Sequence, residues 1–317
     1  MVKVIYIVGF GRSGSTLLDI VLGSHPALEG GGELTNLVQG GWINNDYCAC
    51  GVRGNDCPFW STVRREWTAR TGIRDLESYA KLQEHFTNSK QWAHLKREQR
   101  GPGAQFQDFA RQTVALYETM LQVGGKSAIV DSSKSPVRAL ALSMMPEIDL
   151  RLIHLVRDPR GVAWSLKKPI LKKDGIARGR NPYPVWKAAL KWQEINARSE
   201  WVCHQLAPER VLQARYEDLM ENPRKVLEDI GKTVDLDLSA VAMSFAAGET
   251  LPVHHPIAGN RMRMAGGVKL RPDTEWMEKL SPLERWTVCA LTGWKDNSAS
   301  ARPLPNVAGA PREAEMQ

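Results

Sequence analysis

A glycine-rich segment near the N-terminus carries residue types suited to holding an anion. It reads Gly-Phe-Gly-Arg-Ser-Gly-Ser-Thr over residues 9–16 and directly follows an apolar run at 4–8. Glycines let successive backbone N–H groups point into one hollow, and the N-terminus of a following helix adds partial positive charge. Arg12 is the one side-chain cation of the segment. The residues therefore predict a phosphate-like ligand, held by backbone N–H groups and one arginine.

The spacing of the glycines limits which phosphate compound the segment can hold. Gly9 and Gly14 have the separation of a nucleotide-triphosphatase P-loop, but Ser15 stands where that motif requires a lysine. This departure favours an anhydride donor other than a nucleoside triphosphate. A small-molecule kinase or other P-loop enzyme using ATP and Mg²⁺ remains the alternative.

A second segment repeats the same logic. Residues 155–165 read Leu-Val-Arg-Asp-Pro-Arg-Gly-Val-Ala-Trp-Ser, so an expected strand ends at Arg157 and a helix follows. Asp158 and Pro159 are typical of a helix start, and Ser165 lies two turns further along that helix. Alone, this pattern could be a capped helix beside a solvated arginine. Together with the first segment, it predicts a ligand with two separated phosphates.

A third cation, Lys134, follows the expected strand around residues 127–131. Ligands of parallel α/β sheets bind at the carboxyl ends of the strands. Lys134, Arg12 and Arg157 each come after such a strand, so we expect them to converge on one anionic ligand. The alternative is that each is an ordinary solvated surface charge.

The two segments, taken together and in this order, resemble the donor-binding signatures of the sulfotransferases that use 3′-phosphoadenosine-5′-phosphosulfate (PAPS). The resemblance is to the branch with protein-tyrosine and bacterial sulfotransferases, and it covers roughly residues 1–40 and 125–235. It implies a P-loop-like sulfotransferase fold. It also implies transfer of a sulfuryl group to a hydroxyl of an acceptor. That acceptor would be an alcohol or phenol, either a small molecule, a lipid or a sugar.

The resemblance implies roles for particular residues. Backbone and side chains of the first segment would take the 5′-phosphosulfate, Arg157 and Ser165 the 3′-phosphate, and Tyr216 a place beside the nucleotide. From a basic, glycine-bearing stretch at 259–271, Arg261 and Lys269 are the expected donor contacts. The donor set is thus Gly11, Arg12, Ser13, Gly14, Ser15, Thr16, Arg157, Ser165, Tyr216, Arg261 and Lys269.

Glu33 is the expected general base. It follows three glycines and begins an expected helix, and the resembled branch carries a glutamate at about this distance after the loop arginine. Its other interpretation is a helix-capping carboxylate. Arg12 and Lys134 would stabilise the transferred and leaving groups, with Lys134 alternatively an exposed lysine. His25 is expected to shape a turn, and His254 and His255 are the reserve bases. No metal ligands are assigned, and the reaction is expected to need no metal.

The strand and helix pattern predicts an α/β fold with a central parallel sheet and helices on both faces. Expected strands cover 2–8, 127–131, 150–156 and 210–215. The expected helices are at 15–23, 33–40, 136–145, 159–168, 185–206, 222–234 and 282–292. One domain spans 1–297, with a mostly helical insertion and acceptor region at 42–123. Within that insertion, 42–62 is expected to be an irregular surface loop, and 63–123 helical. The segment 169–183 is expected to be a mobile loop or lid, and 298–317 a disordered tail.

Three of the five cysteines cluster as Cys48, Cys50 and Cys57. Three interpretations stay open from the sequence: reduced or loosely paired thiols, one local disulfide, or a structural zinc site. Zinc would need a fourth ligand, and neither another cysteine nor a histidine lies close by in the sequence.

Composition excludes some functional classes. The net charge is +7, but no basic run interleaved with aromatic residues indicates nucleic-acid binding. No window approaches a membrane span, the N-terminus lacks signal-peptide features, and a cytoplasmic protein is expected. A regulatory module with a decayed site is disfavoured because the expected base and both anion segments are present.

The acceptor is expected to contact residues 42–62, 63–123 and 169–183 and the His254–His255 neighbourhood. The identity of that acceptor and the oligomeric state cannot be deduced from the sequence.

Overall fold

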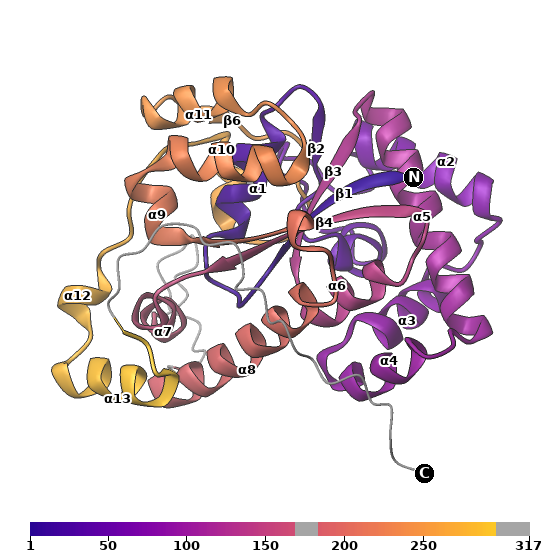
Figure 1. The fold of residues 1–317 in the computed structure, drawn as a ribbon. Helices are drawn as coiled ribbons and strands as arrows, with labels where there is room; N and C mark the ends of the chain where they lie inside the picture. The colour runs from indigo at the N-terminus through magenta and orange to yellow at the C-terminus, as the bar shows by residue number, and fades with distance from the viewer. Residues whose placement is uncertain (169–182, 296–317) are drawn as a thin grey trace, which may run out of the picture.

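The computed structural model describes residues 1–168 and 183–295, and its centre is a five-stranded parallel sheet (Figure 1). The strand order is β2-β3-β1-β4-β5. The strands are β1 (Val2–Val8), β2 (Leu28–Gly30), β3 (Ala128–Lys134), β4 (Ile148–Val156) and β5 (Val211–Arg215). Since β3 and β4 flank β1, the chain segments that follow these three strands meet at one edge of the sheet.

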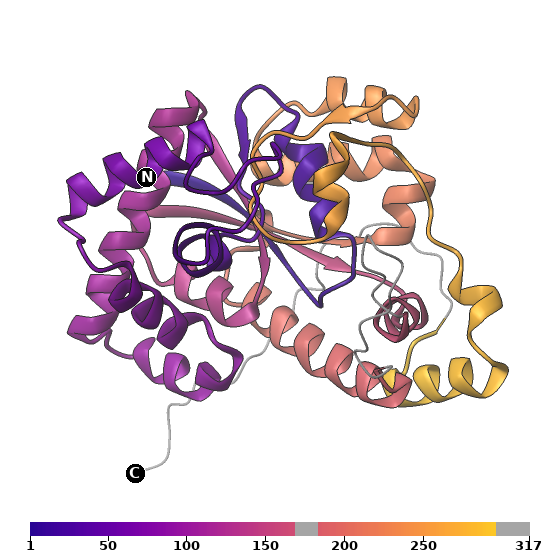
Figure 2. The same ribbon diagram turned by 180° about the vertical axis from the view of Figure 1, so that it is seen from behind.

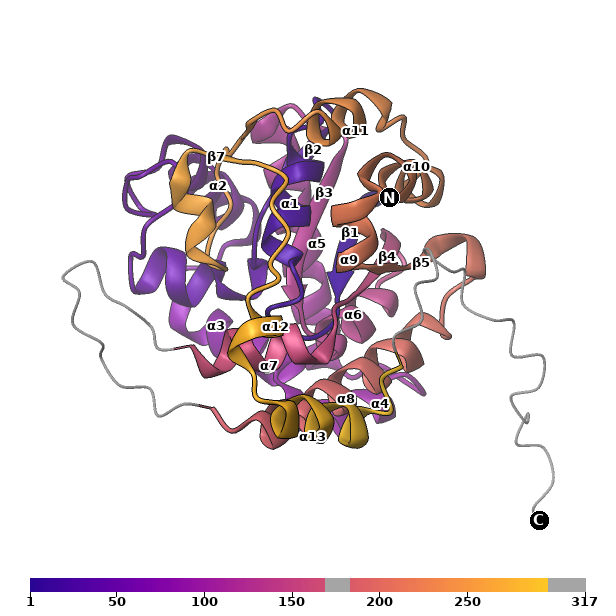
Figure 3. The ribbon, with the colours of Figure 1, turned by 90° about the vertical axis from the view of Figure 1, so that its left-hand side faces the viewer.

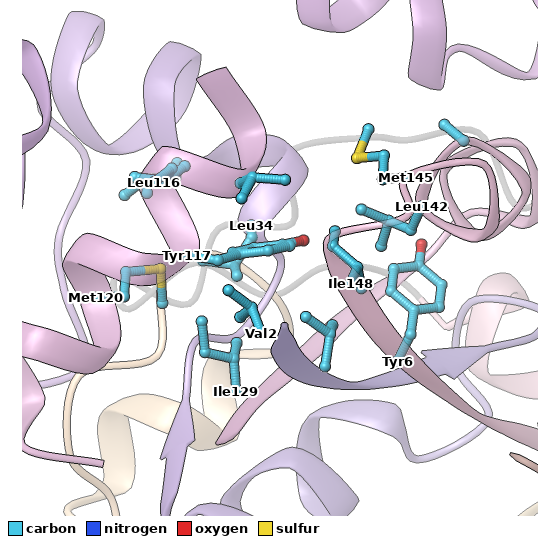
Figure 4. Packing of buried hydrophobic residues seen from close by; sticks show 14 of the residues in the cluster. Val2, Tyr6, Leu34, Leu116, Tyr117, Met120, Ile129, Leu142, Met145 and Ile148 are labelled. Carbon is cyan, nitrogen blue, oxygen red and sulfur yellow. The ribbon is translucent and has the colours of Figure 1, made fainter. Parts of the chain in front are cut away.

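Strand β1 is apolar on both faces because helices cover both sides of the sheet. Val4 and Tyr6 belong to one core cluster, whereas Ile5 and Ile7 belong to the other. The first cluster is shown in Figure 4, where Tyr117 lies over Val2 and Ile129 from the sheet. The expected fold class, a parallel sheet between two helical layers, is confirmed (Figure 2).

The helices divide between these two layers and one end of the sheet. The first layer holds α2 (Pro58–Thr71), α3 (Leu76–Thr87), α4 (Trp92–Glu98), α5 (Ala104–Gly124), α6 (Pro136–Ser143) and the C-terminal part of α8 (Val185–Cys203). The second holds α1 (Ser15–Gly23), α9 (Tyr216–Glu221), α10 (Pro223–Val234) and α11 (Ser239–Ala246). Figure 3 shows α7 (Pro159–Lys167), α12 (Trp276–Lys279) and α13 (Pro282–Thr292) gathered together.

Short elements complete the described chain. Single 3-10 turns are η1 (Leu34–Asn36), η3 (Ser89–Gln91), η4 (Pro208–Arg210) and η5 (Arg261–Ala265), and η2 (Leu37–Ile43) is a π-helical turn. A two-stranded antiparallel ribbon consists of β6 (Leu251–Pro252) and β7 (Gly267–Val268). Every helix of the described ranges is too short or too polar to cross a lipid bilayer.

The structure corrects two local expectations. The helix expected at 33–40 is instead the pair η1 and η2, which begins after Glu33 and continues to Ile43. The segment 42–62 is not an irregular surface loop, because α2 begins at Pro58 and Trp42 and Trp60 are fully buried. Glycine and cysteine suggested a loop, but the aromatic residues between them fill the core beneath α5.

Other expectations stand as follows. Strands and helices expected at 2–8, 15–23, 150–156, 159–168 and 210–215 are present with ends shifted by two residues at most. The lid expected at 169–183 lies almost wholly outside the described residues, and the tail expected at 298–317 lies wholly outside them.

Candidate active site

The glycine-rich segment forms a tight turn between β1 and α1, as its residue types require. Gly14 has a φ of 92°, and a Cβ there would lie 2.6 Å from a ring carbon of Tyr216. Gly9 has a φ of 142°, and its Cβ would meet the carbonyl oxygen of Leu155 at 2.6 Å. Side chains other than hydrogen are therefore excluded at both positions. Helix α1 starts at Ser15 and directs its free N–H groups toward the turn.

The two predicted anion-binding segments contact each other directly. Arg12 Nε donates a hydrogen bond to Ser165 Oγ at 3.1 Å. Arg157 Nη1 donates to the backbone carbonyl oxygen of Arg12 at 3.0 Å. Arg12 and Arg157, which are 145 positions apart in the sequence, are thus in contact. Their places at the ends of neighbouring strands predicted this.

Arg157 is buried and fixed in orientation. Its Nη2 forms an ion pair of 3.0 Å with the carboxylate of Asp273, and its guanidinium lies 4.5 Å from the ring centroid of Tyr216. Its carbonyl oxygen accepts a hydrogen bond from Trp192 Nε1. Burial raises the pKa of the Tyr216 hydroxyl, so this ring stays neutral and serves as an apolar plate under the arginine.

Helix α7 behind Arg157 begins as its sequence predicts. The side chain of Asp158 accepts a hydrogen bond from the backbone N–H of Arg160 at 2.8 Å, and Pro159 occupies the first turn. This cap fixes the direction of α7 and so places Ser165, two turns on, beside Arg12.

Glu33 and Lys134 form an ion pair at the C-terminal end of β3. The backbone N–H of Glu33 donates to the carbonyl oxygen of Ile257 at 2.9 Å, and Asn36 Nδ2 donates to Glu33 Oε2 at 2.9 Å. Lys134 has a φ of 68°, at an irregularity in the pairing of β1 with β3. This left-handed residue turns its side chain out of the regular strand alternation, and its Nζ reaches both Glu33 and the carbonyl of Ser132.

A cavity of about 450 Å³ brings these groups together. Five cationic side chains and two carboxylates line it, so its net charge suits an anion. The lining residues are Gly11, Arg12, Gly14, Ser15, Thr16, Leu17, Glu33, Lys134, Arg157, Ser165, Tyr216, Gly259, Asn260, Met262, Lys269, Arg271 and Asp273.

Two expected donor contacts, Ser13 and Arg261, do not line this cavity. The Ser13 hydroxyl oxygen is buried without a hydrogen-bond partner. Arg261 begins the η5 turn, on the same stretch whose Lys269 does reach the cavity.

The structure also adds lining residues that sequence reasoning missed. Arg271 ends the stretch 259–271 and Asp273 follows it, whereas the expected contacts from this stretch are Arg261 and Lys269. Asn260 donates its backbone N–H to Thr16 Oγ1 at 3.2 Å, so this stretch crosses the glycine-rich turn. Nothing in the sequence told these residues from Arg261, because the stretch has no periodicity.

Asp131, the acidic residue that ends the strand expected at 127–131, lies in the core. It is fully buried, pairs with Arg138 at 2.9 Å and accepts a hydrogen bond of 2.8 Å from the Tyr117 hydroxyl. Its other oxygen accepts the backbone N–H of Ser133 at 3.0 Å. The carboxylate that a P-loop enzyme would use for Mg²⁺ at a strand end therefore has no free oxygen here.

The reserve histidines do not line the cavity. His255 lies beside the cysteine cluster, with Nδ1 3.3 Å from Cys57 Sγ. His254 is exposed, and partial desolvation lowers the pKa of its ring. Among the expected bases, Glu33 alone lines the cavity.

Three aromatic residues of the segment 42–62, which was expected to contact the acceptor, lie in the core. Trp42, Phe59 and Trp60 are buried, and Trp42 packs against Trp67 with ring centroids 5.5 Å apart. These rings belong to the core cluster on one face of the sheet.

Comparison with known proteins places the chain in a family. The family model "Sulfotransferase family" matches residues 56–240, more than half of the chain. The matched range includes Lys134, Arg157, Ser165 and Tyr216 but not the glycine-rich segment or Glu33. No curated protein sequence matches the chain significantly.

Three solved structures that are similar to the chain are also sulfotransferases. The sulfotransferase domain from the curacin biosynthetic pathway is 20% identical, with a TM-score of 0.50, and the match covers 93% of this chain and 99% of that one. The sulfotransferase domain of the Synechococcus PCC 7002 olefin synthase is also 20% identical, with a TM-score of 0.49, over 92% and 95%. Sulfotransferase STF1 from Mycobacterium tuberculosis H37Rv is 14% identical, with a TM-score of 0.43, over 84% and 77%. By the family match over residues 56–240, the chain belongs to the sulfotransferase family.

Proposed function

We propose that this protein transfers the sulfuryl group of PAPS to a hydroxyl group of an acceptor and releases adenosine 3′,5′-bisphosphate. One observation carries the proposal. Two anion-binding segments, joined through Arg12, Ser165 and Arg157, share a single cavity with a carboxylate–ammonium pair.

The donor fits the character of this cavity. The turn at 11–16 offers backbone N–H groups and Arg12 to one phosphate group, and Arg157 with Ser165 offers charged and polar hydrogen-bond donors to another. A nucleotide with phosphates at both the 3′ and 5′ positions needs two such places, whereas ATP carries all its phosphates in one chain. Lys269 and Arg271, from the crossing stretch, add further positive charge over the same cavity.

In the proposed reaction, Glu33 and Lys134 have different roles. The acceptor oxygen forms a bond to sulfur, its proton passes to the Glu33 carboxylate, and the bond between sulfur and the phosphate oxygen breaks. Negative charge then grows on the phosphate oxygen, where Lys134 and Arg12 stabilise it. The sulfuryl group carries less charge than a phosphoryl group, so side-chain cations suffice for this task without Mg²⁺.

The acceptor class stays as broad as the family implies, a hydroxyl-bearing compound. Cytoplasmic placement is part of the proposal, because no disulfide joins any of the five cysteines, all of which the structure describes, and disulfides are rare in a reducing compartment.

Thermal shift and a transfer assay test the proposal. Adenosine 3′,5′-bisphosphate should raise the Tm by about 5 to 10 °C at saturating concentration, since a ligand that binds only the folded state stabilises it. ATP with Mg²⁺ and NADPH are the matched controls and should leave the Tm nearly unchanged. Labelled PAPS should then transfer sulfate to members of a panel of phenols, alcohols and sugars, equally with and without added Mg²⁺. A shift with ATP–Mg²⁺ and none with the bisphosphate would contradict the proposal.

A further inference from the structure

Three cysteines and a histidine form a compact cluster outside the donor cavity. The Sγ atoms of Cys48, Cys50 and Cys57 and one ring nitrogen of His255 all lie within 4.8 Å of one another. His255 Nδ1 lies 3.3 Å from Cys57 Sγ and 3.8 Å from Cys48 Sγ, and the Sγ atoms of Cys50 and Cys57 are 3.7 Å apart. None of the four residues lines the donor cavity.

The separations of 3.3, 3.7 and 3.8 Å are close to the edges of a small tetrahedron around one metal ion. With zinc–sulfur bonds of about 2.3 Å and a zinc–nitrogen bond of about 2.0 Å, tetrahedral geometry gives sulfur–sulfur edges of about 3.8 Å and sulfur–nitrogen edges of about 3.6 Å. A disulfide instead requires sulfur atoms about 2.05 Å apart. The cluster thus has the dimensions of a metal site.

We propose that Cys48, Cys50, Cys57 and His255 bind one structural Zn²⁺ ion. Three thiolates and an imidazole are a ligand set that suits zinc, and four protein ligands leave no open position for water or substrate. The ion would therefore stabilise the fold and take no part in sulfuryl transfer. The sequence did not reveal the set because its fourth ligand lies 198 positions after Cys57.

The backbone around the first two cysteines is arranged as a tight metal-binding turn. Cys48 donates its N–H to Val52 at 2.9 Å, and Gly51 donates to Cys48 at 3.0 Å. Gly51 has a φ of 92°, which favours glycine and lets the chain reverse between these bonds. A bridge between Tyr47 and Arg53 closes the turn, so Cys48 and Cys50 face one point.

Cys57 and Arg263 add favourable electrostatics. Cys57 is the residue that caps the N-terminus of α2, a helix of 14 residues, where the helix dipole favours a thiolate. Zinc with three thiolates and a neutral imidazole carries a net charge of −1. The half-buried Arg263 supplies a neighbouring positive charge and donates to the carbonyl of Tyr47 at 2.9 Å.

The imidazole is held in place by the aromatic residues at the start of α2. Trp60 Nε1 donates to the backbone carbonyl of His255 at 2.7 Å. The ring of Phe59 stacks on that of His255, with centroids 5.4 Å apart and an angle of 14°. Coordination through Nδ1, the nitrogen nearest the sulfurs, requires the ring proton on Nε2.

The site would tie the cysteine turn to the segment that supports Glu33. Ala49 donates its N–H to Pro256, the residue after His255, at 3.4 Å. Ile257 next accepts the N–H of Glu33 at 2.9 Å and donates its own to Gly31 at 3.1 Å. Zinc would thus restrain the backbone around Ile257, which accepts the hydrogen bond from Glu33.

Metal analysis of the full chain tests the proposal most directly. The chain is purified without a metal-binding tag or chelator after expression with added ZnCl₂, and elemental analysis should find about one zinc per chain. Chelator-treated, reduced chain should bind one Co²⁺ with the absorption of a tetrahedral thiolate complex, and Zn²⁺ should displace it. Chain without zinc after expression and after anaerobic reconstitution would overturn the proposal.

Matched variants show whether these four residues are the ligands. Cys50→Ser alters the exposed cysteine of the cluster, and His255→Asn removes the distant ligand. Each should lower the zinc content at least several-fold. His254→Asn changes the residue beside His255, Cys289→Ser changes a cysteine on α13, and both variants should retain one zinc. Equal zinc content in Cys50→Ser and wild type would also overturn the assignment.

Thiol counting and thermal melting complete the test. Denatured chain with chelator should show all five thiols, whereas three would indicate a disulfide and overturn the proposal. Removing zinc from wild type should lower the Tm by about 5 to 10 °C, because only the folded state forms the complete site. The His254→Asn variant should show the same loss, and His255→Asn should show none.

Discussion

At the scale of single residues, each of the few reactive side chains of the candidate site is held by several contacts. Glu33 is fixed through its backbone by Ile257 and through its carboxylate by Lys134 and Asn36. Arg157 is fixed by Asp273 and by the ring of Tyr216. Such restraint keeps a reactive group oriented before substrate binds, which lowers the entropy cost of reaching the transition state.

Replacing Glu33 by glutamine should separate catalysis from binding. Glutamine keeps the size of the side chain but cannot accept the acceptor proton, so Glu33→Gln should lower kcat by about 10²- to 10⁴-fold. The Kd of adenosine 3′,5′-bisphosphate, measured by calorimetry, should change little. Glu29→Gln is a suitable control, because burial already raises the pKa of Glu29 and its carboxyl lies outside the cavity. Full activity of Glu33→Gln would remove it as the base.

Replacing Arg157 by alanine should discriminate between the two phosphates of the donor. The variant should weaken binding of adenosine 3′,5′-bisphosphate by about 10- to 100-fold, the value of a lost charged hydrogen bond. Adenosine 5′-phosphosulfate, which lacks the 3′-phosphate, should bind with nearly the same Kd as to wild type. Arg160→Ala removes a nearby arginine that pairs with Asp158 and serves as the control. Equal losses for both nucleotides would assign Arg157 to another contact.

Residue types and spacing predicted most of the cavity lining, but of the late cationic side chains only Lys269 was named and not Arg271. Arg12, Glu33, Lys134, Arg157 and Ser165 each follow or precede a recognisable strand or helix start, and all line the cavity. Residues after 259 lie in a stretch without periodicity, so only tertiary structure could show which of them face inward.

At the scale of elements, the helix that follows the glycine-rich turn also organises the segment leading to Glu33. Asp19, inside α1 and fully buried, accepts the backbone N–H of Gly32 at 3.1 Å. Burial raises the pKa of its carboxyl to about 8, so the group folds in its neutral form over most of the physiological range.

This buried carboxyl predicts a pH dependence of stability that a single substitution removes. Its pKa is higher in the folded than in the unfolded chain, so its full stabilisation is present below about pH 4 and is lost as the pH rises toward 8. Asp19→Asn keeps an oxygen acceptor for Gly32 but does not titrate. The free energy of unfolding of this variant, relative to wild type, should therefore increase between pH 5 and pH 8. Denaturant titrations at several pH values measure it, and a difference that is independent of pH would contradict the account.

Sequence patterns located elements well where local chemistry decides them. Proline marked the starts of α7 and α13, an N-terminal cap also marked α7, and apolar runs marked β1 and β4. Sequence patterns failed where tertiary packing determines whether an element forms. Strand β2 has three residues and was not predicted, because its pairing with β3 depends on a partner nearly 100 positions away.

At the scale of the whole molecule, one segment after the last strand of the sheet connects the features described above. Between residues 253 and 273 the chain passes the cysteine cluster, supports Glu33, crosses the glycine-rich turn and pairs with Arg157. Figure 3 shows the last part of this segment, which runs from β7 toward α12. The segment lies outside the range that matches the family model, which ends at residue 240.

The central claim is that one nucleotide with phosphates at both ends of its ribose spans the two anion-binding segments. A crystal structure of the protein with adenosine 3′,5′-bisphosphate tests it most directly. The account predicts the 5′-phosphate within the turn at 11–16 and the 3′-phosphate on Arg157 and Ser165. A nucleotide bound elsewhere, or with both phosphates away from these residues, would contradict the account.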